Sequence, residues 1–244
     1  MQLQNHRAVI VGGTSGIGLE TAKLFLSQGA RVTVASRSQE KVNAAVHELG
    51  STAQGYALDF QDESGLKQFF EKIGNIDHLV VTAAGGLSTT APFDAMQIEV
   101  AKAEFDSKFW GQYTTVKAAL PYIRKSGSIT LTSGSAAARP TKGASTLVAI
   151  NSAIEGLTRA LAIDLAPIRV NAVSPGVVDT PIYSGMDPAS RAEVFQKISR
   201  SLLLQHVASP KEIAETYLYL ATNTYTTGSV LQVEGGSILS SGMG

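Results

Sequence analysis

Short apolar runs alternate with longer segments in which apolar positions recur every three or four residues, along the whole chain. The continuous apolar runs predict buried strands, and the longer segments predict helices with one apolar face. The predicted strands cover residues 6–12, 31–35, 54–58, 78–82, 127–133, 168–173 and 229–233. The predicted helices cover 17–28, 39–49, 64–73, 99–123 (one long helix or two abutting ones), 144–165, 188–203 and 210–220. This alternation predicts an α/β protein whose seven-stranded parallel sheet carries helices on both faces.

The composition narrows the possible functions. Hydrophobic residues make up 44% and charged residues 16%, enough for a sizeable core, and no Pro/Ser-rich linker divides the chain, so we expect a single domain over residues 1–244. Lys plus Arg equals Asp plus Glu at 20 each, which argues against a nucleic-acid partner. There is no cysteine and the four histidines are isolated, so we expect no metal site. No signal peptide and no run of ~18 apolar residues stands out. We therefore expect a cytoplasmic protein with no membrane partner.

The first predicted strand runs into a glycine-rich turn, residues 12–18, and then into a helix. Gly12 allows a tight turn, Gly16 lets the backbone approach a pyrophosphate, and Gly18 lets the helix pack on the sheet. The N-terminus of the following helix offers free N–H groups to phosphates. The pattern predicts a dinucleotide-binding loop, the alternative being a turn that binds nothing.

The end of the second predicted strand indicates which dinucleotide is bound. An acidic residue there would hold the adenine ribose hydroxyls and select NAD(H), but Arg37 occupies this region, after Ser36. A guanidinium suits a 2′-phosphate through charge-assisted bonds. We therefore expect NADP(H) to be preferred over NAD(H), unless Arg37 is simply a solvated surface residue.

Six motifs in this order resemble the short-chain dehydrogenase/reductase family over essentially the whole chain. They are the glycine loop, Asp59, residues 83–85, residues 168–176 (IRVNAVSPG), residues 177–180 (VVDT), and the C-terminal motif formed by residues 227–228 and 233–236. Residues 83–85 resemble the end of the family's Asn-Asn-Ala-Gly motif, with Thr82 and Ala83 in place of the two asparagines. The resemblance implies a single-domain, doubly wound Rossmann fold. It also implies a set of cofactor-binding residues: Gly12, Thr14, Ser15, Gly16, Ile17, Gly18, Ser36, Arg37, Asp59, Phe60, Ala83, Ala84, Gly85, Thr132, Pro175, Gly176, Val178 and Thr180.

The chain departs from this family at the catalytic positions. The family uses an Asn, a Ser, a Tyr and a Lys, in which the Tyr gives a proton to the carbonyl while the cofactor gives a hydride. Alignment on the helix motif 155–162 and on Gly111 shows that the corresponding positions hold Lys108, Gly134, Leu147 and Asn151. All four differ, so the resemblance implies an atypical site that lacks the tetrad.

Nearby polar residues are candidate replacements. Ser133 and Ser135 flank Gly134, so a shift of one residue would bring a hydroxyl into place; otherwise they are turn residues at a strand end. Asn151 would hydrogen-bond the cofactor ribose, or it is an ordinary polar helix residue. Lys108 would supply a positive charge or a proton, or it is a solvated helix lysine. The catalytic candidates are therefore Ser133, Ser135 and Asn151.

These observations predict an NADP(H)-dependent oxidoreductase acting on a small to medium apolar carbonyl, imine or quinone-like molecule. A substrate loop at about 180–205 would cover the pocket, with apolar character from Tyr183, Met186 and Phe195. The alternatives are a catalytically inactive NADP(H)-binding sensor or partner subunit, and a structural homologue without cofactor. Two long helical stretches, 108–123 and 144–165, resemble those that build subunit interfaces in this family. We therefore expect a homotetramer, or else a homodimer.

Overall fold

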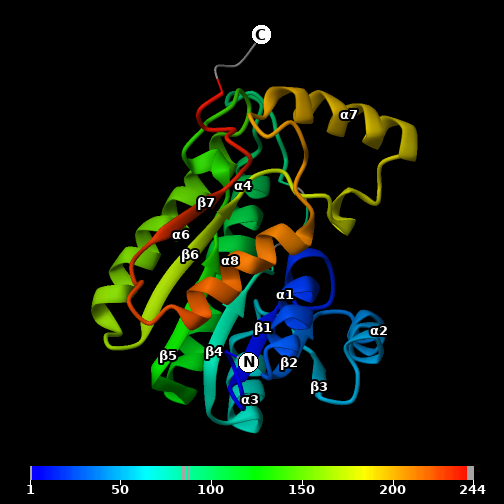
Figure 1. The fold of residues 1–244 in the computed structure, drawn as a ribbon. Coiled ribbons are helices and arrows are strands. Elements are labelled where there is room, and N and C mark those ends of the chain that lie inside the picture. The colour runs from blue at the N-terminus through cyan, green and yellow to red at the C-terminus, as the bar shows by residue number, and fades with distance from the viewer. Residues whose placement is uncertain (1, 84–85, 87, 241–244) are drawn as a thin grey trace.

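The computed structural model describes residues 2–83, 86 and 88–240 (Figure 1). Its centre is a seven-stranded, all-parallel sheet with the order β3-β2-β1-β4-β5-β6-β7. The strands are β1 (Arg7–Val11), β2 (Arg31–Ser36), β3 (Ala53–Ala57), β4 (Ile76–Val81), β5 (Ile123–Thr132), β6 (Arg169–Pro175) and β7 (Val230–Val233). The predicted doubly wound Rossmann fold is confirmed.

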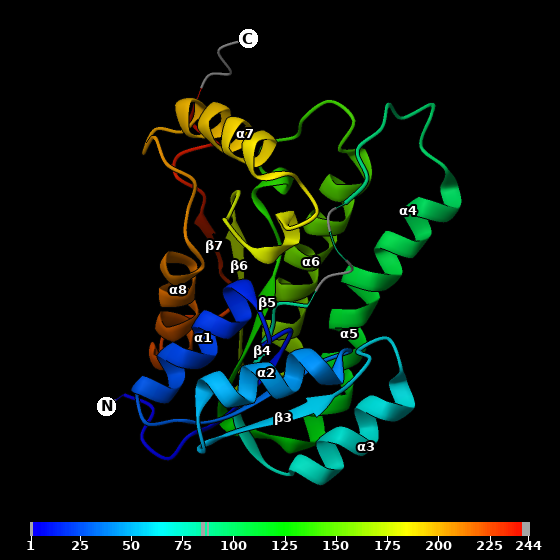
Figure 2. The same ribbon diagram turned by 90° about the vertical axis from the view of Figure 1, so that its right-hand side faces the viewer.

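Helices cover both faces of the sheet (Figures 1 and 2). One face carries α1 (Gly16–Ser27), α2 (Gln39–Leu49) and α8 (Pro210–Thr222), and the other carries α3 (Glu63–Ile73), α5 (Gly111–Ala119) and α6 (Ser145–Asp164). The remaining helices are α4 (Ile98–Phe105) and α7 (Pro188–Ser201), with short turns at η1 (Asp106–Trp110), η2 (Leu120–Tyr122), η3 (Ser135–Ala137) and η4 (Pro181–Tyr183).

Alternate residues of the central strands supply two separate cores. In β1, Ala8 and Ile10 pack with α1 and α8, whereas Val9 and Val11 pack with α3, α5 and α6. A strand that is buried on both faces needs apolar residues at every position, because successive side chains point to opposite sides. This requirement explains the continuous apolar runs of the sequence.

The structure refines three predicted elements. The long helix predicted over 99–123 is two helices, α4 and α5, joined by the π-helical turn η1. Strand β5 begins at Ile123 rather than 127, with a register irregularity where it pairs with β4. The predicted substrate loop, 180–205, contains η4 and the helix α7, none of whose residues is buried.

Helix α6 is the one described helix whose length and apolar composition reach those of a membrane span. Its inner side carries Ile150 and Ile154, both fully buried in the core on the α3–α5–α6 face. Packing against the sheet therefore accounts for the apolar residues on this side of the helix.

Candidate functional site

The strand order reverses between β1 and β4, and the glycine loop lies at the carboxyl ends of these two strands. Open α/β sheets bind ligands at this kind of position. Gly12 has φ +93°, and a Cβ there would lie 2.5 Å from the backbone nitrogen of Ala83. A Cβ on Gly18 would collide with the carbonyl oxygen of Gly12. Both glycines are therefore required by close backbone approach, which keeps the turn tight against β4.

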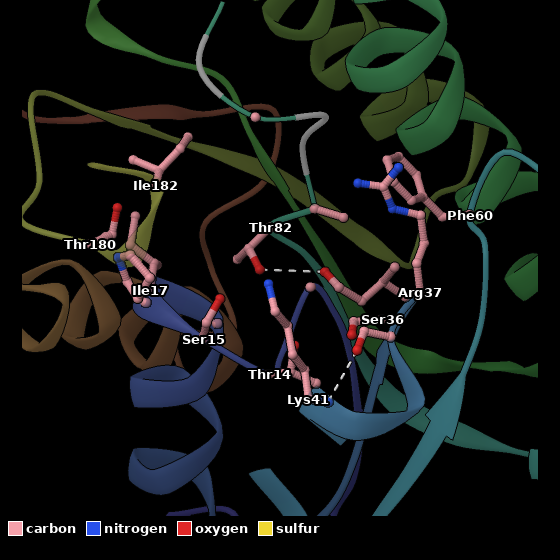
Figure 3. Close-up of a pocket in the computed structure, with 18 of the residues that line it drawn as sticks. Thr14, Ser15, Ile17, Ser36, Arg37, Lys41, Phe60, Thr82, Thr180 and Ile182 are labelled. Carbon is pink, nitrogen blue, oxygen red and sulfur yellow. Dashed lines mark hydrogen bonds between the residues drawn. The ribbon is translucent and has the colours of Figure 1, made fainter. Parts of the chain in front are cut away.

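A cavity of about 530 Å³ opens above this turn (Figure 3). Its lining comes from the glycine loop, the end of β2, the segments after β3 and β4, and η4. The lining residues are Val11, Gly12, Thr14, Ser15, Gly16, Ile17, Gly18, Ser36, Arg37, Ser38, Lys41, Leu58, Phe60, Thr82, Ala83, Gly86, Thr180, Pro181 and Ile182. Segments that are far apart in sequence therefore form one elongated site.

One end of this cavity is formed by the first turn of α1. The N-cap Ser15 makes no side-chain hydrogen bond to the helix, and the first turn has no acidic residue. Its backbone N–H groups are thus available to an anion, and the helix dipole favours negative charge there. Gly16 has φ +52°, and a Cβ there would lie 3.1 Å from Thr180 Cγ2. Thr180 therefore packs closely against the glycine loop, and a side chain at position 16 would be both strained and crowded.

The other end of the cavity is cationic. Arg37 follows β2, and Lys41 stands in the first turn of α2, whose N-cap Ser38 accepts a hydrogen bond from the Lys41 backbone N–H at 3.2 Å. Figure 3 shows both basic side chains beside the cavity. The Ser36 hydroxyl oxygen is buried and has no hydrogen-bond partner among the described residues. An unpaired buried hydroxyl is costly unless a ligand satisfies it. Together with the glycine cradle, it fits a phosphorylated adenosine at this end.

Most of the predicted cofactor-binding residues line the cavity, but several do not. Asp59 is exposed, and its carboxylate accepts a hydrogen bond from the Gln61 backbone at 3.0 Å. Thr132, Pro175, Gly176 and Val178 are not part of the lining. Ala84 and Gly85 lie outside the described residues.

Thr132 instead holds the carboxyl end of β5 in place. Its hydroxyl lies 2.6 Å from both the Val81 carbonyl oxygen and the Tyr217 hydroxyl. The buried side chain of Gln112 pairs with the Thr132 backbone through two bonds of 2.9 Å. These bonds satisfy the polar groups at the carboxyl end of β5 within the protein. They therefore fix the position of the residues that follow the strand.

Sequence reasoning missed several residues of the cavity, Lys41 and Thr82 among them. Lys41 follows Arg37 by four residues at the start of a predicted helix, and this spacing is the signal that would have identified it. The Thr82 hydroxyl donates a 3.4 Å hydrogen bond to the Val11 carbonyl, so it links the ends of β4 and β1.

Three of the four positions assigned to the family's tetrad lie together. The Lys108 amine, carried by η1, donates hydrogen bonds to Asn151 Oδ1 at 2.7 Å and to the Ser133 carbonyl at 3.1 Å. A Cβ on Gly134 would lie 2.9 Å from Asn151 Nδ2. Leu147 is half-buried, one turn before Asn151 on α6.

Burial lowers the pKa of Lys108 to about 8. Its amine contacts Ser133 and Asn151, which are 2% and 1% exposed, and makes no ion pair with any described carboxylate. The interpretation of Lys108 as a solvated helix lysine is therefore wrong. Desolvation disfavours the charged form, so this amine gives up its proton more easily than an ordinary lysine.

The two candidate serines differ in burial and in hydrogen bonding. The Ser133 hydroxyl is buried and donates a hydrogen bond of 3.0 Å to the carboxylate of Glu155, which is half-buried on α6. Ser135 is the first residue of η3 and is partly exposed. Ser133 is thus engaged in joining α6 to the sheet.

Tyr183, in η4, packs edge-on against Phe195 of α7 with ring centroids 5.2 Å apart. Burial, and then the negative charge of Asp179, raises the pKa of the Tyr183 hydroxyl. This apolar pair belongs to the segment predicted to cover the substrate.

Comparison with known proteins gives consistent matches over the whole chain. Residues 11–237 match the family model described as enoyl-(acyl carrier protein) reductase. The chain is 32% identical to the short-chain dehydrogenase/reductase ATR9 of Stachybotrys chlorohalonatus, over 97% of this chain and 98% of that protein. It is similar to the crystal structure of a small-chain dehydrogenase in complex with NADPH, with 38% identity, a TM-score of 0.85 and coverage of 97% and 100%. It is also similar to the MalC reductase/Diels-Alderase of Malbranchea aurantiaca, with 30% identity, a TM-score of 0.90 and 98% coverage of each chain.

Proposed function

Because the chain belongs to the short-chain dehydrogenase/reductase family, we propose that it is an NADP(H)-dependent oxidoreductase with an atypical active site. The cavity carries this proposal, since it joins the glycine cradle and the α1 N-terminus to the cations Arg37 and Lys41. The cradle would hold the pyrophosphate, and the basic end would hold the adenosine. The bound cofactor supplies or accepts a hydride, and the chain orients it.

The preference for NADP(H) over NAD(H) rests on charge at the end of β2. Two basic side chains and an unpaired Ser36 hydroxyl line this end of the cavity, and no acidic residue lines it within the described part of the chain. Charge-assisted hydrogen bonds from a guanidinium match a 2′-phosphate. The similar small-chain dehydrogenase was crystallised in complex with NADPH, which is consistent with this preference.

The substrate class follows from what stands near the carboxyl end of β5. Leu147 has no proton to give, and Gly134 has no hydroxyl to orient a carbonyl. We propose a small to medium apolar carbonyl, imine or quinone-like substrate, covered by residues 180–205 with Tyr183 and Phe195. Loss of general acid catalysis costs about 10²–10⁴ in rate, whereas the positioning of the cofactor against the substrate makes a separate contribution that remains.

The test is a binding titration followed by a turnover panel. NADPH and NADH affinities are measured by fluorescence, and NADPH consumption is then followed with ketones, quinones, imines and enones. The proposal expects tighter binding of NADPH than of NADH, and consumption with at least one class. Tight NADPH binding without consumption across the panel would contradict the enzymatic function.

A second candidate function is a catalytically inactive NADP(H)-binding sensor or partner subunit. Leu147 favours it, because an aliphatic side chain stands where the family's proton donor is expected. NADPH binding without turnover, together with co-purification of an active relative, would support this candidate.

We also propose that the protein forms a homotetramer, or else a homodimer. Trp110 and Tyr113, on η1 and α5, are large side chains with 49% and 37% exposure, and Ile163 on α6 is 79% exposed. Large apolar side chains exposed on helix surfaces are typical of subunit contacts. Light scattering at micromolar concentration tests this, and a monomer would refute it.

A further inference from the structure

Residues 180–201, here called the lid, connect two anchored points of the chain. Before the lid, Val178 is 5% exposed, and the Asp179 backbone N–H donates a hydrogen bond of 2.8 Å to the Ala208 carbonyl oxygen. After it, Leu202 is 8% exposed. None of the lid residues, all of which the structure describes, is buried, and α7 stands apart from the helices that cover the two faces of the sheet (Figures 1 and 2). A segment with so little buried apolar surface opens locally at a low cost in free energy.

The start of the lid forms one wall of the cavity. Thr180, Pro181 and Ile182 belong to the cavity lining. A Cβ on Gly16 would lie 3.1 Å from Thr180 Cγ2 and 3.7 Å from Pro181 Cδ, so the lid packs directly against the glycine loop. Figure 3 shows Thr180 and Ile182 beside Ile17, at the start of α1. The lid therefore borders the position at which a molecule would bind the glycine loop.

Four side chains, here called the clasp, tie α7 to the anchored residue that precedes the lid. The Arg191 guanidinium makes an ion pair with Asp179, and it lies 5.3 Å from the centroid of the Phe195 ring. Phe195 packs edge-on against Tyr183 of η4, with ring centroids 5.2 Å apart. Arg191 thus links the exposed helix to a residue whose backbone is fixed by its bond to Ala208.

The clasp is weak enough to open and close. The side chains of Arg191 and Asp179 are both partly exposed, and exposed ion pairs and cation–π contacts each change an equilibrium by about fivefold or less. None of the four clasp residues is part of the described cavity lining. The clasp should therefore favour the closed lid equally whether or not a molecule occupies the cavity. Opening of a lid sets the rate of ligand release in many enzymes.

We propose that Arg191 is a positioning residue that holds the lid closed over NADP(H) through Asp179, and that the cofactor enters and leaves the cavity only when this ion pair is broken. The inference rests on the proposed function, because it takes the cavity as the NADP(H) site. A group that favours the closed lid equally in the free and the bound protein slows entry and exit of the cofactor by the same factor. The dissociation constant is the ratio of these two rate constants, so it stays unchanged.

Stopped-flow fluorescence with NADPH tests the inference, because it measures both rate constants. R191A is expected to raise the association and dissociation rate constants by about fivefold each, and to leave the dissociation constant within about twofold of the wild-type value. R191K keeps the positive charge and is expected to bring both rate constants part of the way back. D179N/R191A should exchange NADPH no faster than R191A, since both substitutions break the same ion pair.

The controls separate this inference from folding and from the proposed function. Arg200 is an exposed arginine in the last turn of α7 that makes no ion pair with a described residue, so R200A should leave both rate constants unchanged. Thermal melting should be unchanged in R191A, R191K and R200A, because no lid residue is buried, and this shows that the variants are folded.

Two outcomes would overturn the inference while cofactor binding stands. In the first, R191A exchanges NADPH at the wild-type rates. In the second, the dissociation constant of R191A changes by more than the twofold margin, which would mean that Arg191 acts on the bound cofactor and not on the lid. If the wild type does not bind NADPH at all, the proposed function itself fails, and this inference fails with it.

Discussion

Gly134 and Asn151 are fitted to each other, because a Cβ at residue 134 would lie 2.9 Å from the Asn151 amide nitrogen. We expect G134S to displace that amide and break the bond to Lys108, at a cost of about 1–3 kcal/mol of unfolding free energy, which is typical of overpacking. Denaturant titration measures this cost.

A double-mutant cycle identifies the cause. In an N151A background the amide is absent, so G134S should cost less than it does alone, by about 0.5 kcal/mol or more. Gly185 is exposed, and a Cβ there would meet nothing within 4 Å, so G185S is the matched control. Equal costs of G134S in both backgrounds would show that the two residues are not coupled.

The fold could be predicted from the sequence because two patterns of apolar residues, the continuous runs of strands and the recurrence every three or four residues of helices, are strong and local. Continuous apolar runs such as residues 8–11 belong to strands that are buried on both faces, and the helix caps and glycines around them mark the element ends. The start of β5 was missed because Arg124, Lys125 and Ser126 are exposed. Backbone hydrogen bonds form a strand there without an apolar pattern.

The cofactor end of the site was predictable for the same reason, since residues 12–18 and Arg37 are close in sequence and follow adjacent strands. The other end was not predictable in detail. Lys108 and its partner Asn151 are 43 residues apart, and η1 is a π-helical turn that no local pattern indicates. Whether an amphipathic helix exposes or buries a given lysine depends on tertiary packing.

Arg37 and Lys41 should set the preference for NADP(H). Removing a charge-assisted bond to the 2′-phosphate costs about 1.5–3 kcal/mol, so R37A should weaken NADPH binding about tenfold or more and leave NADH binding nearly unchanged. K41A should act in the same direction with a smaller effect, since an ammonium makes a less directional contact than a guanidinium. Fluorescence titration with both nucleotides measures these changes.

Arg31 gives a matched control for this prediction. It is an exposed arginine at the other end of β2, away from the cavity. R31A should leave both affinities unchanged. An equal loss of NADPH and NADH affinity in R37A would mean that Arg37 does not contact the 2′-phosphate.

His78 should make the stability depend on pH. Its pKa is lowered to about 4, first by burial and then by the neighbouring His6, whose ring nitrogen lies 2.9 Å away. The imidazole of the unfolded chain titrates near pH 6.5. As the pH falls from 6.5 toward 4, the unfolded state therefore binds a proton at His78 whereas the native state does not. The contribution of the neutral His78 to the free energy of unfolding is present above about pH 6.5 and is lost as the pH falls toward 4. Between pH 7 and pH 5 the loss is about 2 kcal/mol.

Substitution isolates this contribution from the titration of carboxylates. Chemical denaturation at pH 7 and pH 5 should show a smaller difference for H78Q than for the wild type. His47 is exposed on α2, so H47Q should keep the wild-type difference. If H78Q loses as much stability as the wild type on acidification, the buried imidazole is not responsible.

Leu147 offers a gain-of-function prediction. It is half-buried on α6, one turn before Asn151, which accepts the hydrogen bond from the Lys108 amine, so we expect a tyrosine there to bring a hydroxyl close to these two side chains. A nearby ammonium lowers a phenol's pKa and makes it a better proton donor. General acid catalysis is typically worth about 10²–10⁴ in rate, and a newly placed group should reach the low end, so L147Y should reduce simple ketones about a hundredfold faster than L147F.

L147F is the matched control, because it adds the ring without the hydroxyl. NADPH consumption with a ketone and with an enone separates the effects: the ketone rate should rise in L147Y alone, whereas the enone rate should change equally in both variants. Equal ketone rates in L147Y and L147F would show that position 147 does not face the reacting oxygen.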